Sequence, residues 1–380
     1  MRLDILPVRT EREKREFYGF AWRVYRCDPF WVPPLWPQRK AYLDHRATFF
    51  NYGEGDFFLA TYEGETLGTI GAGINHSQNR ELGAQSGLFG FFEVLPDGYE
   101  IAKGMWDHVC QWARDRGLKE IHGPYNYAPS EENGFLIDGF DAVPPIMTAH
   151  TPSYYGEFAE RYGFVKESDS LAYRFDFSQI GYDVANAPPV VHRIAARFAQ
   201  RHGAQTMRTP RMEDWDREIP ALHALYNKSL AVLPDYSPME YSEFEAQALA
   251  LRPLIDPELV FIAEMAGKTV GLALGLPNFT EALRYAHGLR WPWDYLRFML
   301  ARGRIRGASF KILVIDPEYW GYGLETAMLL EIARAVMRKG YTWADGSLTG
   351  ETNPQTNKIA QRLGARVYRR YRIYRLSLEG

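Results

Sequence analysis

The sequence predicts two α/β domains in tandem, and three observations lead to this prediction. The chain has 380 residues, a length that favours two domains over one. Its two halves repeat the same order of elements at matched spacing. In each half, an apolar strand runs through a turn into an amphipathic helix and then into another strand, which is typical of α/β proteins.

The composition is that of a soluble globular protein, with 46% hydrophobic and 24% charged residues. The net charge is −3, so no basic excess points to a nucleic-acid partner. No segment approaches the roughly 20 apolar residues of a spanning helix, and the first residues do not read as a signal peptide. Cys27 and Cys110 lie far apart, which predicts neither a disulfide scaffold nor a metal site. We therefore expect a cytoplasmic protein without stable membrane insertion.

The repeat begins with a hairpin in each half. Residues 58–68 and 261–271 both read as strand, glycine turn and strand. Later elements follow in the same order: apolar strands at 88–94 and 311–315, helices from about 97 and from 324, strands at 119–122 and 341–344, short helices at 155–162 and 356–363, and last strands at 171–175 and 371–376. The turn glycine and the closing glycine are 99 residues apart in the first half (Gly64, Gly163) and 97 in the second (Gly267, Gly364).

Local signals mark where the elements begin and where the halves separate. Thr10 and Glu13 have capping-box spacing, as have Asp97 and Glu100, and each pair predicts a helix start. Turn and breaker residues between 176 and 191 predict the boundary. The predicted domains are 1–178 and 192–380, joined by a linker at 179–191, and their leading helices are 10–23 and 212–230.

The turn of the second half, Trp320-Gly321-Tyr322-Gly323-Leu324-Glu325, carries a resemblance to a known family. The order of elements and this turn resemble the GNAT superfamily of acyltransferases, across essentially the whole chain as two copies. The resemblance implies a mixed, mostly antiparallel sheet flanked by helices in each domain. Further segments resemble a poorly characterised group of tandem GNAT-like bacterial proteins: 28–35, 123–126, 137–141 and 371–374.

The resemblance implies that acetyl-CoA or another acyl-CoA is the co-substrate and that its pyrophosphate lies on this turn. A helix N-terminus offers unpaired N–H groups and partial positive charge, which suits an anion. The expected cofactor-binding residues are Ile315, Trp320, Gly321, Tyr322, Gly323, Leu324, Glu325, Asn353 and Asn357. Trp320 replaces the family's Gln or Arg, and Glu325 replaces its Gly or Ala and would repel phosphate. A plain strand-to-helix turn is the alternative.

The first half departs further from the family's pattern. Its equivalent stretch, 94–100, keeps one glycine and places two carboxylates in the first helical turn, so we expect this half to be degenerate for CoA. Many family members use a tyrosine four residues before the closing glycine as general acid. Those positions are Ala159 and Ala360 here, so this acid is missing from both halves.

Other side chains are candidates for the chemistry. Glu351 follows an inner strand of the second half and is the candidate general base; a solvated loop carboxylate is the alternative. Tyr154, or its neighbour Tyr155, could serve a site in the first half, although core packing also explains them. We expect His150 to have a structural rather than a catalytic role. A polar loop follows a strand of the first half and is also explained by turn formation: Asn126, Glu131, Glu132 and Asn133.

About thirty residues between Pro277 and Ser309 exceed what the second hairpin needs, and they combine aromatic and arginine residues. We interpret this insertion as a lid over the acceptor site; a packing element or dimer contact is equally open, and a membrane-surface helix is a further alternative.

The function predicted from these features is a CoA-dependent N-acyltransferase, acetyltransferase-like, acting on a small-molecule or peptide-like amine acceptor. A homodimer is possible. An aminoacyl-type transferase and a catalytically inactive ligand-binding protein of the same fold are the alternatives.

Overall fold

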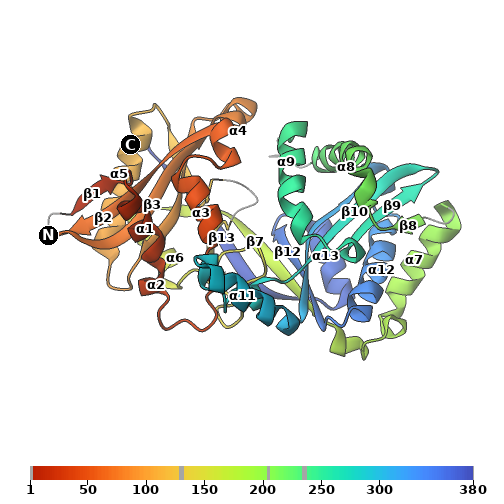
Figure 1. The fold of residues 1–380 in the computed structure, drawn as a ribbon. Coiled ribbons are helices and arrows are strands. Elements are labelled where there is room, and N and C mark those ends of the chain that lie inside the picture. Colours follow the sequence, from red (N-terminus) through yellow and green to blue (C-terminus); the bar gives the residue numbers. More distant parts are fainter. Residues whose placement is uncertain (1–2, 128–131, 203–205, 233–237, 380) are drawn as a thin grey trace. The chain divides into compact units, whose positions relative to one another are not determined.

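The chain forms two compact units in a computed structural model that describes residues 3–127, 132–202, 206–232 and 238–379 (Figure 1). Unit 1 comprises Met1–Leu171, Thr280–Gly303 and Arg369–Gly380. Unit 2 comprises Ala172–Phe279 and Arg304–Tyr368. The units therefore differ from the predicted division at 178 and 192, because two segments from the second half of the sequence belong to unit 1.

Unit 1 is built on a mixed sheet in which every strand pair is antiparallel except β4 and β5. The strand order is β1-β2-β3-β4-β5-β13, and β6 also pairs with β13. The strands are β1 (Asp4–Pro7), β2 (Gly53–Tyr62), β3 (Glu65–Asn75), β4 (Ser86–Val94), β5 (Glu120–Gly123), β6 (Phe135–Asp138) and the part of β13 (Arg366–Ser377) that starts at Arg369.

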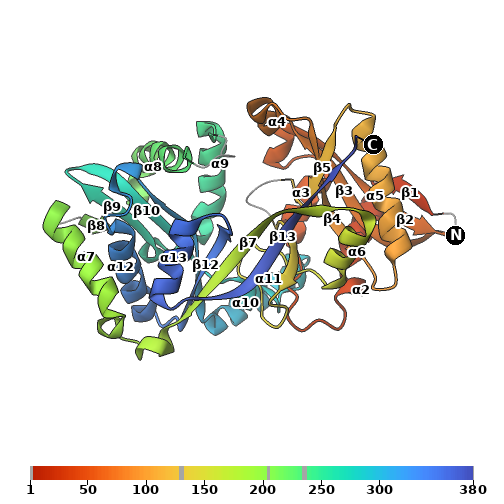
Figure 2. The ribbon, with the colours of Figure 1, turned by 180° about the vertical axis from the view of Figure 1, so that it is seen from behind.

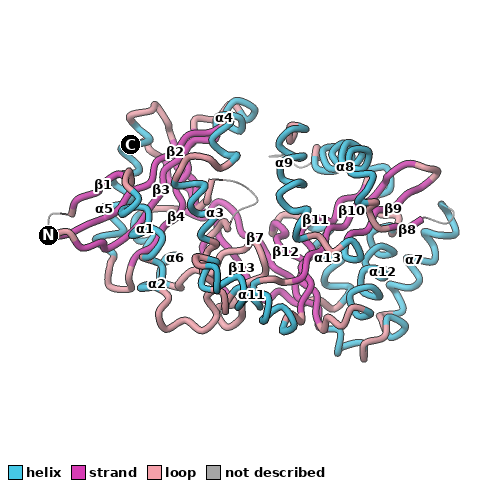
Figure 3. The backbone as a smooth tube through the Cα atoms, viewed as in Figure 1, coloured by secondary structure: helices cyan, strands magenta, loops and turns pink. Residues whose placement is uncertain are grey.

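Helices cover this sheet on both faces (Figure 3). One face packs against α5 and α6 through a cluster centred on Trp106, Phe92 and Phe135. The other packs against α1 and α3 through Phe57 and Tyr127. The helices of unit 1 are α1 (Glu11–Gly19), α2 (Ala21–Val24), α3 (Trp36–Leu43), α4 (His76–Leu82), α5 (Tyr99–Arg114), α6 (Tyr154–Tyr162), α10 (Thr280–Leu283) and α11 (Pro292–Ala301).

Unit 2 repeats the arrangement. Its strands follow the order β7-β12-β11-β10-β9-β8, with β11 and β12 parallel. One core lies under α7 and α12, and another under α8 and α9. The elements are β7 (Val165–Asp176, from Ala172 on), α7 (Pro189–His202), β8 (Thr206–Arg208), α8 (Trp215–Leu230), α9 (Tyr241–Leu251), β9 (Val260–Met265), β10 (Lys268–Pro277), β11 (Gly307–Ile315), α12 (Leu324–Arg338), β12 (Trp343–Gly350) and α13 (Pro354–Leu363). The predicted fold class is thereby confirmed.

The last strand in the second half of the sequence, β13, joins the sheet of unit 1. Tyr374 of β13 pairs with Gly123, and Leu376 pairs with Ile121, so β13 lies beside β5 (Figure 2). Tyr374 is buried in the core of unit 1. Conversely, the end of β7 neighbours β12 in unit 2. Apolar periodicity predicts both strands, but it does not specify which sheet they join.

Two predicted helix starts have different outcomes. Thr10 caps α1 in a capping box with Glu13, as predicted. The predicted box of Asp97 and Glu100 is wrong, because α5 begins at Tyr99 and its N-cap, Gly98, makes no side-chain cap. A turn between Leu95 and Gly98 precedes the helix and moves its start past Asp97. None of the helices in the described ranges is long and apolar enough to cross a membrane.

Candidate active site

The two parallel strands at the centre of unit 1 separate partway along their length. β4 and β5 pair over three positions, from Ser86 opposite Glu120 to Leu88 opposite His122. Beyond this point, the pairing of β4 with β3 is irregular and Phe91 has a φ of 51°. A bulge of this kind ends strand pairing and redirects the side chains that follow.

At the bulge, side chains rather than a neighbouring strand make the hydrogen bonds to the backbone of β4. The amide oxygen of Asn126 accepts a hydrogen bond from the Phe91 N–H at 2.8 Å. The hydroxyl of Thr69 donates to the Phe91 carbonyl at 2.9 Å. Asn133 in turn holds Asn126, accepting from its backbone N–H at 2.9 Å. The polar loop noted in the sequence therefore positions the end of β4, with Glu131 outside the described residues.

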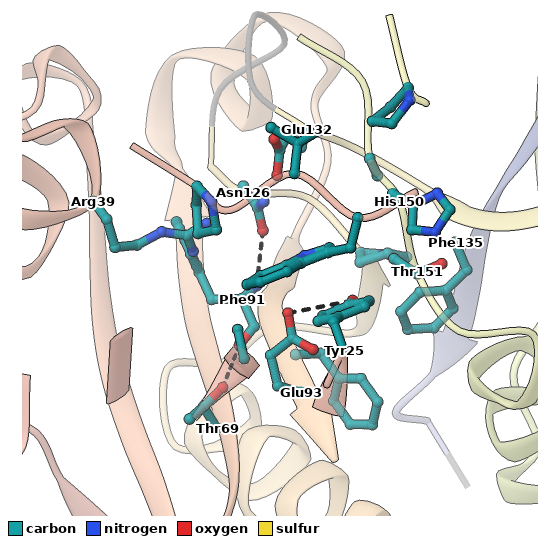
Figure 4. A pocket seen from close by; sticks show the side chains of 18 of the residues that line it. Tyr25, Arg39, Thr69, Phe91, Glu93, Asn126, Glu132, Phe135, His150 and Thr151 are labelled. Atoms are coloured by element: carbon teal, nitrogen blue, oxygen red, sulfur yellow. Dashed lines mark hydrogen bonds between the residues drawn. The ribbon is translucent and has the colours of Figure 1, made fainter. Parts of the chain in front are cut away.

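The bulge faces a pocket whose lining comes entirely from unit 1 (Figure 4). Aromatic and polar side chains both line its walls. The aromatic residues are Phe17, Tyr18, Tyr25, Trp31, Phe91, Phe92 and Phe135; the polar ones include Arg39, Thr69, Glu93, Asn126, Glu132, Thr148, His150 and Thr151. An apolar cavity with a few convergent polar groups is the usual form of a small-molecule site.

Two carboxyl groups, Glu93 and Glu132, line this pocket, and Glu93 is the buried one that contacts Tyr25 and Tyr155. Removal from water raises its pKa to about 7. A hydrogen bond donated by the Tyr155 hydroxyl at 2.7 Å and the positive charge of Arg39 partly oppose this rise. The Tyr25 hydroxyl lies 3.5 Å from the other carboxylate oxygen (Figure 4). Glu93 can therefore gain or lose a proton near neutral pH.

The two phenols beside Glu93 stay protonated at neutral pH. Burial raises the pKa of both Tyr25 and Tyr155. Tyr25 is fixed by stacking on Trp31, with ring centroids 4.7 Å apart. Tyr155 also accepts a hydrogen bond from the Val94 N–H at 3.0 Å. The carboxylate is thus held by rigid donors at the wall of the pocket.

His150 forms part of the pocket wall in a fixed neutral state. Arg369 donates to its Nδ1 at 2.7 Å, so the proton is assigned to Nε2, which lies 2.7 Å from Asp28. Burial, together with the charge of Arg369, lowers the pKa of His150. These contacts support the structural role predicted for this histidine.

The two predicted catalytic residues do not line the pocket. The Tyr154 hydroxyl donates to the Val94 carbonyl at 2.7 Å, whereas its neighbour Tyr155 contacts Glu93. Glu351 follows β12 in unit 2, where its backbone carbonyl accepts from Asn357. Sequence reasoning missed Glu93 as a candidate. The available signal was its position as the single charged residue in the apolar segment 88–94.

The predicted phosphate turn of unit 2 has the expected backbone. Gly321 and Gly323 have φ of 75° and 103°, and α12 begins directly after them. The indole N–H of Trp320 donates to the Ile315 carbonyl at 2.8 Å and closes the turn. This bond gives a structural reason for a tryptophan in place of the family's Gln or Arg. Tyr322 is exposed, and the ring of His202 lies 5.0 Å from its ring.

Glu325 occupies the N–H donors that a phosphate would use. Burial raises the pKa of its carboxylate, and hydrogen bonds accepted from the backbone N–H groups of Glu325 itself and of Gly323 partly oppose this rise. Ile194 of α7 packs against Gly323. The helix N-terminus in unit 2 is therefore satisfied by the chain's own carboxylate.

The two asparagines assigned to the cofactor hold the turn after β12. The side chain of Asn353 caps α13 by accepting from the Thr356 N–H at 3.2 Å. The Asn357 amide donates to the carbonyls of Gly350 and Glu351 and accepts from Tyr173. These bonds give both residues a role in shaping this turn.

Comparison with known proteins identifies the fold of this chain. No model of a protein family matches it. It is 27% identical to a bacterial ceramide synthase of Caulobacter vibrioides (strain NA1000 / CB15N), over 99% of this chain and 98% of that protein. It is 25% identical to Protein YghO of Escherichia coli (strain K12), over 97% of this chain and 94% of that protein.

Two solved structures show the same architecture over the full chain. One is a tandem GNAT protein from the clavulanic acid biosynthesis pathway, with a TM-score of 0.57, 13% identity and coverage of 100% of this chain and 99% of that one. The other is a GCN5-related N-acetyltransferase from Sphaerobacter thermophilus, with a TM-score of 0.54, 15% identity and coverage of 100% and 96%. The chain thus has the tandem GNAT fold, as the resemblance implied.

Proposed function

We propose that this protein of tandem GNAT fold is an acyl-CoA-dependent N-acyltransferase whose acceptor is the amine of a long-chain amino alcohol. The fold supports an acyltransferase-type function. The relative named as a ceramide synthase extends along the full chain, and a ceramide is the amide of a fatty acid and a long-chain amino alcohol. This similarity supports a lipid-like amine as the small-molecule acceptor.

The observation that carries the proposal is Glu93 in its aromatic pocket. A primary amine is protonated at neutral pH and must lose a proton before it attacks a thioester. Glu93, with a pKa of about 7, is matched to accept that proton. The amine nitrogen then bonds to the acyl carbon and the C–S bond breaks. The proton held by Glu93 passes to the departing thiolate, and the nitrogen gives up its second proton to solvent to leave the neutral amide.

The rest of the pocket suits the same acceptor. Its cavity measures about 70 Å³, so the aromatic wall would contact the amine end of the acceptor. Arg39 lies with its guanidinium 4.5 Å from the centre of the Phe91 ring and makes no ion pair with any described residue. A guanidinium in this position can donate to the oxygen of an amino alcohol.

Two helix N-termini are candidates for the CoA phosphates. In unit 1, α5 begins at Tyr99 after the short turn that follows Val94, and no described side chain caps its first N–H groups. In unit 2, Glu325 fills the equivalent donors. We propose that the α5 turn serves the transfer at Glu93, contrary to the expected degeneracy of the first half, and that the 320–325 turn is a second phosphate site closed by Glu325.

We expect Glu325→Ala to convert binding of one CoA per chain into binding of two. Removing the carboxylate frees the N–H groups of Gly323 and residue 325, and removes a negative charge from an anion site. Isothermal titration with CoA measures the stoichiometry. Adding Gly323→Trp should restore one site, and Glu331→Ala on the exposed part of the same helix is the matched control. An unchanged stoichiometry in Glu325→Ala would exclude CoA from this turn.

The function itself is tested with the purified protein, a long-chain acyl-CoA and sphinganine. We expect release of free CoA thiol and formation of the amide, detected by mass spectrometry, and a slower reaction with acetyl-CoA. Amide formation from an aminoacyl-tRNA without CoA would favour an aminoacyl-type transferase. Binding of CoA without turnover on any amine of this class would make the protein a ligand-binding relative.

A further inference from the structure

Helix α11 has its apolar face on the outside. Asp294 has no exposed surface and Ala301 is buried, whereas Leu296 is 61% and Leu300 is 75% exposed. Trp293 and Met299 are also exposed and lie on the same side at helical spacing. A surface helix of a globular protein normally shows the reverse pattern. Among the described residues, the outer face of α11 therefore lacks the apolar packing that such side chains usually have.

The start of α11 is fixed by bonds within the helix, and the residues before it are tied to the rest of unit 1. The Asp294 carboxylate accepts from the Trp291 N–H at 3.0 Å and from Arg297 at 3.1 Å. Before the helix, Gly288 packs closely against Tyr18, and Arg284 donates to the Pro29 carbonyl at 2.5 Å. The insertion, which carries α11 (Figure 1), is thus part of unit 1, and the apolar side chains of the helix stay exposed.

Two tryptophans extend the apolar face at the start of the helix. Trp291 and Trp293 stack on each other, with ring centroids 5.3 Å apart, and about half of each side chain is exposed. Exposed tryptophans of this kind are enriched where proteins meet the interface of a lipid bilayer. Their rings combine a large apolar area with an N–H group that suits the headgroup region.

The charge around this face is positive. The segment 284–302 contains Arg284, Arg290, Arg297 and Arg302 against the single carboxylate Asp294, a net charge of +3 within a chain whose net charge is −3. Arg290, Arg297 and Arg302 are exposed beside the apolar residues. Arginines around an apolar stripe complement the phosphates of anionic lipids and can extend their charged ends into the headgroup layer.

We propose that α11 and the preceding Trp291 dock this protein on the surface of an anionic lipid bilayer, with the exposed apolar face buried at the boundary between headgroups and acyl chains. The docking is peripheral and needs no spanning helix. It goes beyond the proposed acyl transfer, although it would bring the enzyme to the place where long-chain amines reside.

The test is sedimentation of the full-length protein with vesicles of phosphatidylcholine alone or mixed with phosphatidylglycerol. We expect binding to the anionic vesicles that weakens at high salt. The variant Leu296→Ser/Met299→Ser/Leu300→Ser should bind at least about tenfold more weakly, because it removes the buried apolar area. Leu82→Ser, at an exposed leucine of α4, is the matched control and should bind like the wild type.

Brominated lipids locate the contact. They should quench the fluorescence of wild-type protein, and Trp291→Phe/Trp293→Phe should lose most of that quenching while still sedimenting with vesicles. The proposal is overturned if the wild type does not bind anionic vesicles, or if the triple variant binds equally well. It is also overturned if the triple variant abolishes a concentration-dependent dimer, measured by sedimentation velocity, in a protein that ignores vesicles. Because sedimentation requires no turnover, a failure of the proposed acyl transfer would leave this result unaffected.

Discussion

Replacing Glu93 with glutamine is expected to lower kcat/KM for acyl transfer by about 10²–10⁴-fold, the usual contribution of a general base. Glutamine keeps the shape of the side chain and can still accept from Tyr155, which lies 2.7 Å from the carboxylate. The variant should therefore fold and bind the amine. Steady-state kinetics with a long-chain acyl-CoA and sphinganine measures the loss, and Glu81→Gln on the exposed side of α4 is the control.

The pH dependence separates a catalytic from a structural role of Glu93. Wild-type activity should rise as pH passes through about 7, because Glu93 must be ionised to accept the proton. Glu93→Gln should lose this titration from its residual activity. A variant that keeps both wild-type activity and the wild-type pH profile would rule Glu93 out as the base.

The same residue makes stability depend on pH with a defined sign. Its pKa is raised in the folded protein, so the folded state holds this proton more tightly than the unfolded chain does. The resulting stabilisation is complete below the unfolded pKa and is lost as pH rises through about 7. Glu93→Gln cannot ionise and does not lose stability in this way. As the pH rises from acidic to neutral, the melting temperature of the variant should therefore increase relative to that of the wild type.

Replacing Gly90 with alanine is expected to destabilise unit 1 by about 3 kcal/mol and to reduce activity at the same time. A Cβ at this position would collide with the backbone carbonyl of Tyr125 and lie 3.0 Å from the Asn126 amide oxygen. Backbone cannot move aside as a side-chain end can. Because Asn126 holds the Phe91 N–H, the collision also displaces the bulge that positions Glu93.

Denaturant unfolding compares Gly90→Ala with Gly87→Ala in the same strand. At Gly87, the nearest atom to an added Cβ is the end of the Leu118 side chain at 3.0 Å, which can shift. We expect the midpoint of Gly87→Ala to stay close to wild type. Equal midpoints for the two variants would contradict the close approach of β4 to Tyr125.

The sequence by itself determined the tandem architecture, because it depends on local signals. The hairpin turns at Gly64 and Gly267 have positive φ as their pattern predicts. The apolar stripe of α12 is buried along its length, from Leu324 to Val336. Such features need only a few neighbouring residues, and their recurrence at matched spacing was enough to predict two related domains.

Only the tertiary structure decided where the candidate site lies. Tyr25, Glu93 and Tyr155 come from the end of α2, from β4 and from α6, and no spacing in the chain relates them. The pKa of Glu93 depends on their packing around it.

The partner of the last strand and the direction of α11 have the same origin. Periodicity predicts that β13 is a strand and that the insertion is amphipathic, but burial is set by contacts distant in sequence. β13 joins β5 across more than 240 residues, and Asp294 rather than Leu300 turns inward on α11. Local pattern specifies an element and its faces; which surface each face meets is a property of the folded chain.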